Sequence, residues 1–272
     1  MVKTPSMREL LHGAQSVSTV DPDNTFGVKK KQASKELPAI RAELFSLQER
    51  LWAEQRRAVL VVLQGMDTSG KDGTIAHVMT GLDPTGVHVY GFKVPTPEEL
   101  QHDFLWRIRK HVPLTGMVGV FNRSHYEDVL VVRVDNLAPP DVVERRYGRI
   151  NRFETELVSA GVTMVKVMLH ISFEEQRRRL IARLEDPTKH WKFSAADIDT
   201  RAQWGEYMQA YDIVLSRCSP PSAPWYVVPA DARWFRNYAV SYLLLETLRE
   251  MNPGYPQRKL NVRRLLARLQ AQ

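Results

Sequence analysis

The stretch AVLVVLQGMDTSGKDGT, residues 58–74, decides the fold of this 272-residue chain. Its first six residues are all apolar and rich in Val, which is typical of a central strand buried on both faces of a parallel sheet. A glycine-rich turn follows, and residues from Thr74 onward have helical periodicity. A strand, a tight turn and a helix in direct succession predict the start of a βαβ unit.

Similar apolar runs recur along the chain, separated by stretches with helical periodicity. Strands that alternate with helices in this way indicate a three-layer α/β/α fold with a parallel central sheet. We expect one such domain over residues 36–252. The further strands are predicted at residues 87–94, 117–121, 162–171 and 225–228, and an amphipathic helix is predicted before the first strand, over residues 37–55.

Three segments fall outside this alternation. Residues 1–35 are polar and predict an irregular N-terminal arm on or near the main body, with a small basic run at residues 29–31. Residues 186–204 are polar and follow an Asp-Pro step, which favours a lid or connecting loop. Residues 253–272 carry five basic residues and no acid, which predicts a short basic amphipathic helix. Binding phosphate chains, contacting another subunit and plain solvation all remain open for it.

The composition narrows the partners and the compartment. The chain has 38 Lys and Arg against 31 Asp and Glu, a net charge of +7. Such a surface attracts nucleic acid, an acidic membrane face, nucleotides or inorganic phosphate, although excess charge is often only solvated. One cysteine, Cys218, excludes an internal disulfide and fits a reducing cytosol. The longest apolar run, residues 58–63, is far too short to cross a bilayer, so we expect a cytoplasmic protein without a membrane partner.

The turn after the first strand has the spacing of a phosphate-binding loop. Gly65, four intervening residues, Gly70 and Lys71 reproduce it, and the unpaired amides of the following helix favour an anion. The alternative is a tight turn that only joins a strand to a helix. The residues expected to cradle phosphate are Gly65, Ser69, Gly70, Lys71, Gly73 and Thr74.

The same loop departs from the usual pattern by carrying acids. Asp72 stands where a P-loop enzyme places Ser or Thr to hold magnesium, and Asp67 lies inside the loop itself. Carboxylates would repel a phosphate unless a divalent cation bridges them, and Mg²⁺ prefers carboxylate and phosphate oxygens. Asp67 is therefore the first candidate metal ligand and Asp72 the second. For Asp72, a first-turn acid that stabilises the helix dipole is an equal alternative.

A second polar cluster follows the strand at residues 117–121. Polar residues at a parallel strand end fall in the crevice where α/β sheets bind ligands, so Arg123 is expected to face the phosphates. Glu127 is a candidate metal ligand or proton acceptor, with a solvated first turn as the alternative. His125 lacks a metal-ligand pattern and is expected to pack or to form hydrogen bonds. Farther along, four arginines at residues 177–183 precede the lid, and one or two of them are expected to act on a polyanion.

Taken in order, four motifs resemble the family-2 polyphosphate kinases. They are the loop at residues 65–74, the segment FNRS at 121–124, the lid from Asp186 to Ser194, and PWYVVPAD at 224–231. The resemblance implies a P-loop kinase fold with a helical lid. It also implies that inorganic polyphosphate donates a phosphoryl group to a nucleotide with the help of Mg²⁺, with Mn²⁺ as an alternative metal.

Carried over by position, the resemblance implies catalytic roles for Asp67, Lys71, Arg123 and Arg183. Asn122 stands where two subclasses have Asp, and the run NRSHYEDV looks like the third subclass, whose members accept nucleoside mono- and diphosphates. Glu127 then compensates for the amide as a metal ligand. The residues expected to guide the phosphate chain are Arg133, Arg178, Lys189 and Lys192. The resemblance also implies a homodimer or homotetramer.

The leading hypothesis is a polyphosphate:nucleotide phosphotransferase that acts on AMP and ADP to make ADP and ATP. The alternative within the same class is a nucleotide or small-molecule kinase that uses ATP as its donor. A nucleic-acid-binding protein is a third reading, motivated by the charge, but the sequence has no recognition motif and its phosphate loop is acidic.

Overall fold

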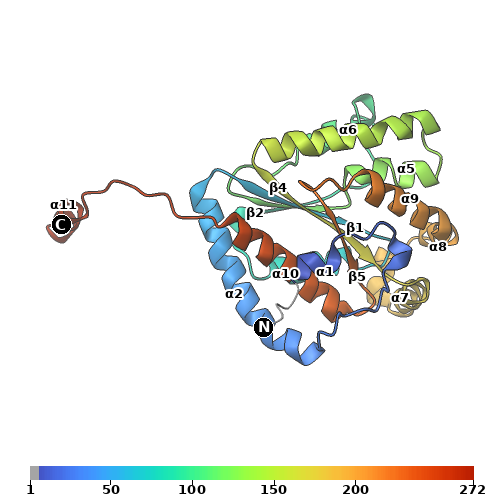
Figure 1. The fold of residues 1–272 in the computed structure, drawn as a ribbon, viewed down its shortest axis with the longest axis horizontal. Coiled ribbons are helices and arrows are strands. Elements are labelled where there is room, and N and C mark those ends of the chain that lie inside the picture. The colour runs from blue at the N-terminus through green and yellow to red at the C-terminus, as the bar shows by residue number, and fades with distance from the viewer. Residues whose placement is uncertain (1–5) are drawn as a thin grey trace.

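The computed structural model describes residues 6–272 and is built around one five-stranded sheet (Figure 1). The strand order is β2-β3-β1-β4-β5, and every pairing is parallel. This confirms the predicted α/β fold with a parallel central sheet. The strands are β1 (Ala58–Gln64), β2 (Val87–Gly91), β3 (Val118–Asn122), β4 (Val162–His170) and β5 (Trp225–Pro229).

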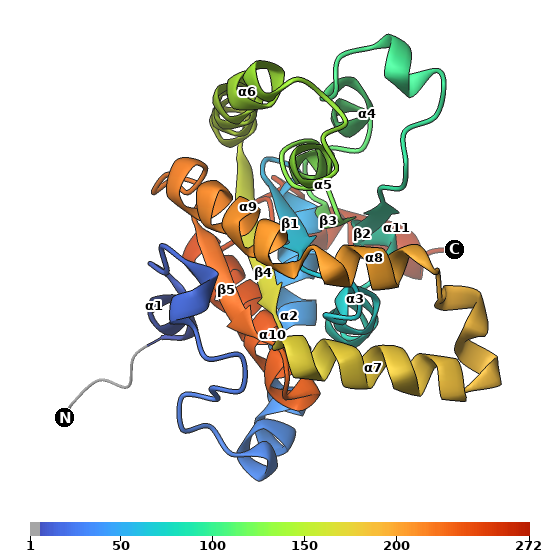
Figure 2. The ribbon, with the colours of Figure 1, turned by 90° about the vertical axis from the view of Figure 1, so that its right-hand side faces the viewer.

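Side-chain alternation along β1 builds a hydrophobic core on each face of the sheet. Ala58, Leu60 and Val62 belong to one core, where α6 (Pro140–Ser159) and α9 (Trp204–Arg217) supply the facing residues. The intervening residues of β1 belong to the other core, which is covered by α2 (Lys30–Glu54), α3 (Lys71–Met79) and α10 (Arg233–Met251). Figure 2 shows these helices on opposite sides of the strands. Because both faces are buried, the strand reads as a continuous apolar run.

The N-terminal arm is more ordered than the sequence predicted. Helix α2 begins at Lys30, not Leu37, and contains Pro38 in its interior; the buried Ala33 extends its apolar stripe toward the N-terminus. Before it lie α1 (Met7–Leu11) and the 3-10 turn η1 (Val17–Thr19), and α1 packs against α10 and β5. The arm thus lies on the body, but it is not irregular, because its apolar side chains complete the core. Residues 1–5 lie outside the described part.

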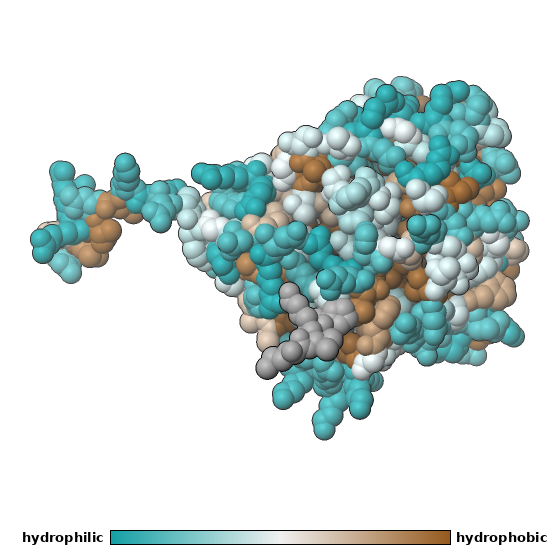
Figure 3. Space-filling model, in the orientation of Figure 1, coloured by the Kyte–Doolittle hydropathy of each residue, from teal (hydrophilic) through white to brown (hydrophobic). Residues whose placement is uncertain are grey.

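The predicted lid is formed by the 3-10 segment η5 (Pro187–Lys192) and α8 (Ala196–Ala202), which follow α7 (Phe173–Glu185). In Figure 2, α7 and α8 lie in front of the strand ends. At the other extreme, α11 (Val262–Gln270) stands away from the body, and all its residues are exposed (Figures 1 and 3). The remaining elements are η2 (Pro84–Gly86), η3 (Glu99–Gln101), α4 (Trp106–Arg109), η4 (His125–Asp128) and α5 (Val131–Val134). Within residues 6–272, no helix is both long and apolar enough to span a bilayer.

Strand order also determines where a ligand can bind. From β1 the chain runs to β2 at one edge and back to β3, and then crosses to β4 on the other side of β1. Strand order therefore reverses beside β1, and in open parallel sheets the crevice at such a point, outside the carboxyl ends of the strands, is the usual ligand site. The loop after β1 and the turn after β3 both open into this crevice.

Candidate active site

The loop between β1 and α3 needs glycine at both ends for steric reasons. Gly65 has φ +148°, and a Cβ there would lie 2.5 Å from the carbonyl oxygen of Leu169. Gly70 has φ +100°, and a Cβ there would overlap the guanidinium of Arg236. Any other residue would strain the backbone and push on its neighbours at both positions. The glycine spacing noted in the sequence thus reflects close packing around the loop.

Lys71 is folded back into the loop. Its Nζ donates to the carbonyl oxygens of Gly65 at 2.7 Å and Met66 at 3.3 Å. Burial lowers the pKa of Lys71, and the nearby charge of Arg123 lowers it further. The ammonium is therefore almost completely removed from water and lies where it can contact an anion held by the loop.

Two residues predicted to bind phosphate point elsewhere. Thr74 is fully buried, and its hydroxyl donates to the carbonyl of Gly70 at 3.0 Å, because the first turn of α3 turns this side chain toward the sheet. Ser69 is also fully buried, and its hydroxyl has no hydrogen-bond partner in the described part of the chain. The loop offers backbone amides and Lys71 to a ligand rather than these hydroxyls.

Both loop acids are paired with groups from other elements. Asp67 accepts a hydrogen bond from Arg123 at 2.9 Å, and Asp72 accepts one from the side-chain amide of Asn122 at 2.8 Å. Lys192 of the lid lies 3.2 Å from the other oxygen of Asp72. Burial tends to raise the pKa of Asp72, but the hydrogen bonds of Asn122 and Lys192 lower it below its ordinary value. Asn122 thus binds a loop acid directly.

The three residues predicted to hold metal do not form one cluster. Within residues 6–272 no group of three or more His, Cys, Asp or Glu side chains is arranged to hold an ion. Asp67 and Asp72 line one cavity, whereas Glu127 lines a neighbouring cavity that contains Asp67 but not Asp72. Mg²⁺ usually takes one or two carboxylates and completes its shell with substrate phosphates and water. The pair Asp67 and Asp72 fits that donor set, and a three-carboxylate cage is absent.

Three cavities meet at the loop. The central one, of about 610 Å³, lies between the loop, the end of β3 and the lid. The second, of about 230 Å³, is lined by six cationic side chains and no acid: Arg179, Arg183, Lys189, Lys192, Arg233 and Arg236. The third, of about 330 Å³, is lined by four acids, Asp67, Glu127, Asp135 and Asp197, together with Arg123, Tyr207, Tyr211 and several apolar side chains.

The structure brings most of the predicted residues to these cavities. The central cavity is lined by Asp67, Gly70, Lys71, Asp72, Gly73, Arg123, Arg183 and Lys192. Lys189 lines the basic cavity, and Gly65 and Glu127 line the third. Arg178 and Arg133 line none of the three. Arg178 forms a bidentate pair with Glu175, and Arg133 pairs with Glu144 on α6, so each points along its own surface.

Several site residues were missed by sequence reasoning. Arg179 is nearly buried and donates to the carbonyls of Thr68 at 2.9 Å and Ala230 at 2.6 Å, which fastens the loop to α7 and to the end of β5. Arg236 of α10 donates to the carbonyl of Ser69 at 3.1 Å. Asp197 of the lid pairs with Arg183 at 3.2 Å. The arginine run of α7 was a signal for Arg179, but nothing local marked Arg236 or Asp197.

The site combines a glycine loop ahead of a helix N-terminus with a buried lysine and flanking arginines, and it lies at the switch point of a parallel sheet. Together these features define an α/β protein of the phosphate-binding kinase type. A family model described as "Polyphosphate kinase 2 (PPK2)" matches residues 27–256. The chain belongs to the polyphosphate kinase 2 family.

Named relatives agree with this assignment. The AMP/ADP-polyphosphate phosphotransferase of Meiothermus ruber is 48% identical over 247 residues, which is 90% of this chain and 92% of that protein. The ADP-polyphosphate phosphotransferase of Rhodopseudomonas palustris is 44% identical over 79% of this chain and 78% of its own. The crystal structure of polyphosphate kinase 2 from Arthrobacter aurescens TC1 superposes with a TM-score of 0.95 at 46% identity and covers 98% of both chains.

Proposed function

We propose that this protein transfers a phosphoryl group from inorganic polyphosphate to AMP and ADP, making ADP and ATP. Its named relatives carry out transfers between polyphosphate and these nucleotides. The observation that carries the proposal for this chain is the chemical contrast between the two cavities on either side of the loop. One is lined by cations without acids, and the other by acids and tyrosines.

The basic cavity suits a donor that is phosphate throughout its length. Apart from its six cations it is lined by Thr68, Gly70, Gly73 and Ala182, so no aromatic or large apolar side chain is present to hold a purine. Burial, together with the repulsion of the neighbouring guanidinium groups of Arg179 and Arg233, lowers the pKa of Arg236 to about 10. A polyanion relieves that repulsion. An ATP donor would need a nucleoside pocket that this side of the loop lacks.

The third cavity suits the nucleoside end of an acceptor. Tyr207, Tyr211 and the aliphatic residues of α5 offer apolar surface, whereas the carboxylates of Asp135 and Asp197 can accept hydrogen bonds from ribose hydroxyls or base amines. The same carboxylates repel phosphate, so the phosphate end of the acceptor is directed toward Arg123 and Lys71. Arg123 lines both this cavity and the central one, where the two substrates meet.

The transfer itself needs positioning and charge more than it needs proton transfer. An ionised phosphate oxygen of AMP or ADP attacks the terminal phosphorus of the chain. A new phosphoanhydride bond forms, the bond to the chain breaks, and the chain leaves one phosphate shorter. Because the attacking oxygen is already ionised near neutral pH, no general base is required. Lys71, Arg123 and Arg183 offset charge on the transferring group, as such reactions demand.

We also assign the metal site to Asp67 and Asp72, with Mg²⁺ as the preferred ion and Mn²⁺ as the alternative. A bound divalent ion would supply positive charge to the phosphate oxygens and reduce repulsion between donor and acceptor. Glu127, whose pKa is raised by burial, lines a cavity with Asp67 but not with Asp72, and it is assigned to the acceptor cavity. A homodimer or homotetramer working in the cytoplasm remains part of the proposal.

The proposal is tested with the purified protein, Mg²⁺ and AMP or ADP, with either polyphosphate or ATP as donor, followed by chromatography of the products. We expect ADP and ATP from polyphosphate, and a loss of turnover by orders of magnitude in Lys71→Ala. Transfer that requires ATP and ignores polyphosphate would replace the proposal with the ordinary kinase reading. The chelator EDTA should abolish turnover, and excess Mg²⁺ should restore it.

A further inference from the structure

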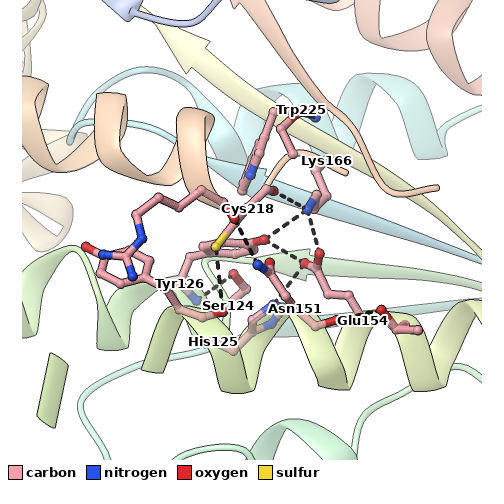
Figure 4. Close-up of polar contacts among 12 residues, drawn as sticks. Ser124, His125, Tyr126, Asn151, Glu154, Lys166, Cys218 and Trp225 are labelled. Atoms are coloured by element: carbon pink, nitrogen blue, oxygen red, sulfur yellow. Dashed lines mark hydrogen bonds and ion pairs between the residues drawn. The ribbon is translucent and has the colours of Figure 1, made fainter. Parts of the chain in front are cut away.

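A buried polar network lies beneath the turn that carries Arg123, and the proposed chemistry leaves it unused (Figure 4). It joins Lys166 at the centre of β4, Glu154 of α6, and His125 and Tyr126 of η4. None of these four side chains is more than 1% exposed. Charged and polar groups at such depth are costly unless every one of them is bonded.

Lys166 is completely satisfied within this network. Its Nζ donates to Glu154 at 2.6 Å, to the hydroxyl oxygen of Tyr126 at 2.9 Å and to the backbone oxygen of Cys218 at 2.8 Å. An ammonium group has three hydrogens, so none is left over. Burial raises the pKa of Glu154, but the charge of Lys166 and the hydrogen bonds from His125 and Lys166 together outweigh it and leave that pKa below its ordinary value. The pair is therefore a buried ion pair.

The second carboxylate oxygen of Glu154 holds the turn that follows Arg123. It accepts the Tyr126 hydroxyl at 2.7 Å and the His125 ring nitrogen at 3.2 Å. A carboxylate only accepts, so both side chains donate to it. His125 and Tyr126 are the second and third residues after Arg123. Two consecutive side chains thus tie this short turn to α6 and, through Lys166, to β4.

Arg123 itself has a strained backbone. Its φ of +62° lies in the left-handed region, which costs a residue with a side chain about 1 kcal/mol or more and persists only where the surroundings enforce it. On the upstream side, its amide donates to Leu63 at 3.1 Å, and the hydroxyl of Ser124 accepts from Gln64 at 3.0 Å. On the downstream side the restraint is the Glu154 network. In this conformation the guanidinium reaches Asp67.

We propose that Glu154 and Lys166 are positioning residues, which clamp the η4 turn and thereby keep Arg123 in the strained conformation that aims its guanidinium into the active site. The identity of the transferred group rests on the proposed function, but the clamp does not. Burial of both partners in one ion pair explains how the clamp stays rigid without touching substrate.

Two double variants test the clamp and differ only in the residue at position 154. Both carry Lys166→Met, which removes the ammonium; one adds Glu154→Gln and the other Glu154→Leu. Removing both charges together is tolerated far better than orphaning one. Glutamine keeps an acceptor oxygen for Tyr126 and His125, whereas leucine, of similar size, does not. We expect the Gln variant to retain kcat within about threefold and the Leu variant to lose about tenfold, because misplacement of a charged group by less than 1 Å weakens transfer strongly.

A cycle with Arg123→Ala separates positioning from general destabilisation. Without Arg123, exchanging Gln for Leu at position 154 should change kcat less than twofold, because the residue being positioned is gone. Leu44→Ala, in the core on the other face of the sheet, serves as a stability control: it should lower the melting temperature without lowering kcat. Equal kcat in the Gln and Leu variants, or a tenfold loss that persists without Arg123, overturns the proposal.

Further measurements cover two cases, a Leu variant that does not fold and a protein that shows no turnover. If the Leu variant does not fold, Tyr126→Phe is used in its place. Tyr126→Phe removes one hydrogen bond between the turn and Glu154 and leaves the ion pair intact. It is then combined with Arg123→Ala in the same double-mutant cycle. Calorimetric titration with tripolyphosphate measures the anion site without turnover. We expect weaker binding in the Leu than in the Gln variant, and no difference once Arg123 is absent. A wild-type protein that binds tripolyphosphate but transfers nothing would refute the function and leave the clamp standing, whereas equal affinities would refute the clamp.

Discussion

Replacing Arg236 by methionine tests the assignment of the basic cavity to the donor. Arg236 reaches the loop from α10, 167 residues away in sequence, and lines the basic cavity but not the other two. Its guanidinium is nearly buried and sits close to those of Arg179 and Arg233. Methionine replaces the apolar stem of the side chain with an unbranched apolar chain and removes the guanidinium with its charge and its hydrogen bonds.

The expected effect follows from the loss of one charge-assisted contact to phosphate. Hydrogen bonds to charged groups contribute about 1.5–3 kcal/mol, which corresponds to about 10- to 100-fold in an equilibrium constant. Because the cavity is separate from the one assigned to the nucleoside, the whole effect should appear in the KM for polyphosphate. The KM for AMP or ADP should stay within about twofold of the wild-type value.

Steady-state kinetics with each substrate varied in turn measure both constants. Arg249→Met is the matched control, since Arg249 lies on the same helix and pairs with Glu43 at the surface. It should leave both constants unchanged. An unchanged KM for polyphosphate in Arg236→Met, or an equal rise for both substrates, would refute the division of the two cavities between donor and acceptor.

Three further predictions concern pH, metal and the C-terminal helix. Burial raises the pKa of Asp128 to about 6, so the native state holds a proton that the unfolded state has already lost. The free energy of unfolding of the wild type, measured relative to Asp128→Asn, should therefore fall by up to about 3 kcal/mol as pH rises from 4 to 6 and stay level above pH 6. Denaturant titrations at several pH values measure this difference. A rise between pH 4 and 6 would contradict a raised pKa for Asp128. Asn122→Asp places a second carboxylate beside Asp72, so the melting temperature of this variant should fall in the absence of Mg²⁺. Added Mg²⁺ should raise the melting temperature of the variant more than that of the wild type. The lack of such a metal-dependent recovery would count against a metal site at Asp72. Deleting residues 258–272 should leave the melting temperature unchanged because every residue of α11 is exposed and the helix stands away from the body (Figure 1), and a fall would mean that the helix packs on another copy.

Much of the fold could be predicted because it depends on local patterns. The six-residue apolar run of β1 is buried on both faces, and the glycines at 65 and 70 mark places where a Cβ has no room. Boundaries were less accurate. The sequence predicted a helix over residues 37–55, but α2 begins at Lys30 and runs through Pro38, since the packing of its apolar stripe outweighs the loss of one hydrogen bond.

The site was harder to predict because it depends on which face of each helix packs inward. Arg178 and Arg179 are neighbours in sequence, yet Arg179 fastens the loop while Arg178 pairs with Glu175 at the surface. Consecutive side chains on α7 point about 100° apart around the helix axis, so two neighbours can have completely different roles. Only the packed structure determines which face of α7 points inward. Arg236 and Asp197 come from elements that meet the loop only in three dimensions. Thr74 was predicted to bind phosphate from its place in the loop, but the first turn of α3 points its side chain toward the sheet.

The pairing of charges in the central cavity explains why a phosphate site contains acids. Asp67 pairs with Arg123, Asp72 with Lys192, and Asp197 with Arg183, so three of the proposed phosphate-binding cations are each held by a carboxylate from a different element. Two of these pairs join the lid to the body or to α7, and they keep the cations in place in the absence of substrate. A phosphate chain that takes the cations leaves three carboxylates without their cationic partners close to an anion, which is unfavourable in a partly buried site.

A divalent cation offsets that loss, because it can bind the freed oxygens of Asp67 and Asp72 and the phosphate together. On this view metal and polyphosphate bind cooperatively, and each should raise the affinity of the other by the same factor. Calorimetric titration of tripolyphosphate at several Mg²⁺ concentrations measures that factor, after correction for the metal bound by free tripolyphosphate. The enhancement should disappear when Asp67 and Asp72 are both replaced by Asn. An enhancement that survives this double replacement would place the metal on the substrate alone, and the loop acids would then serve only to hold their cations.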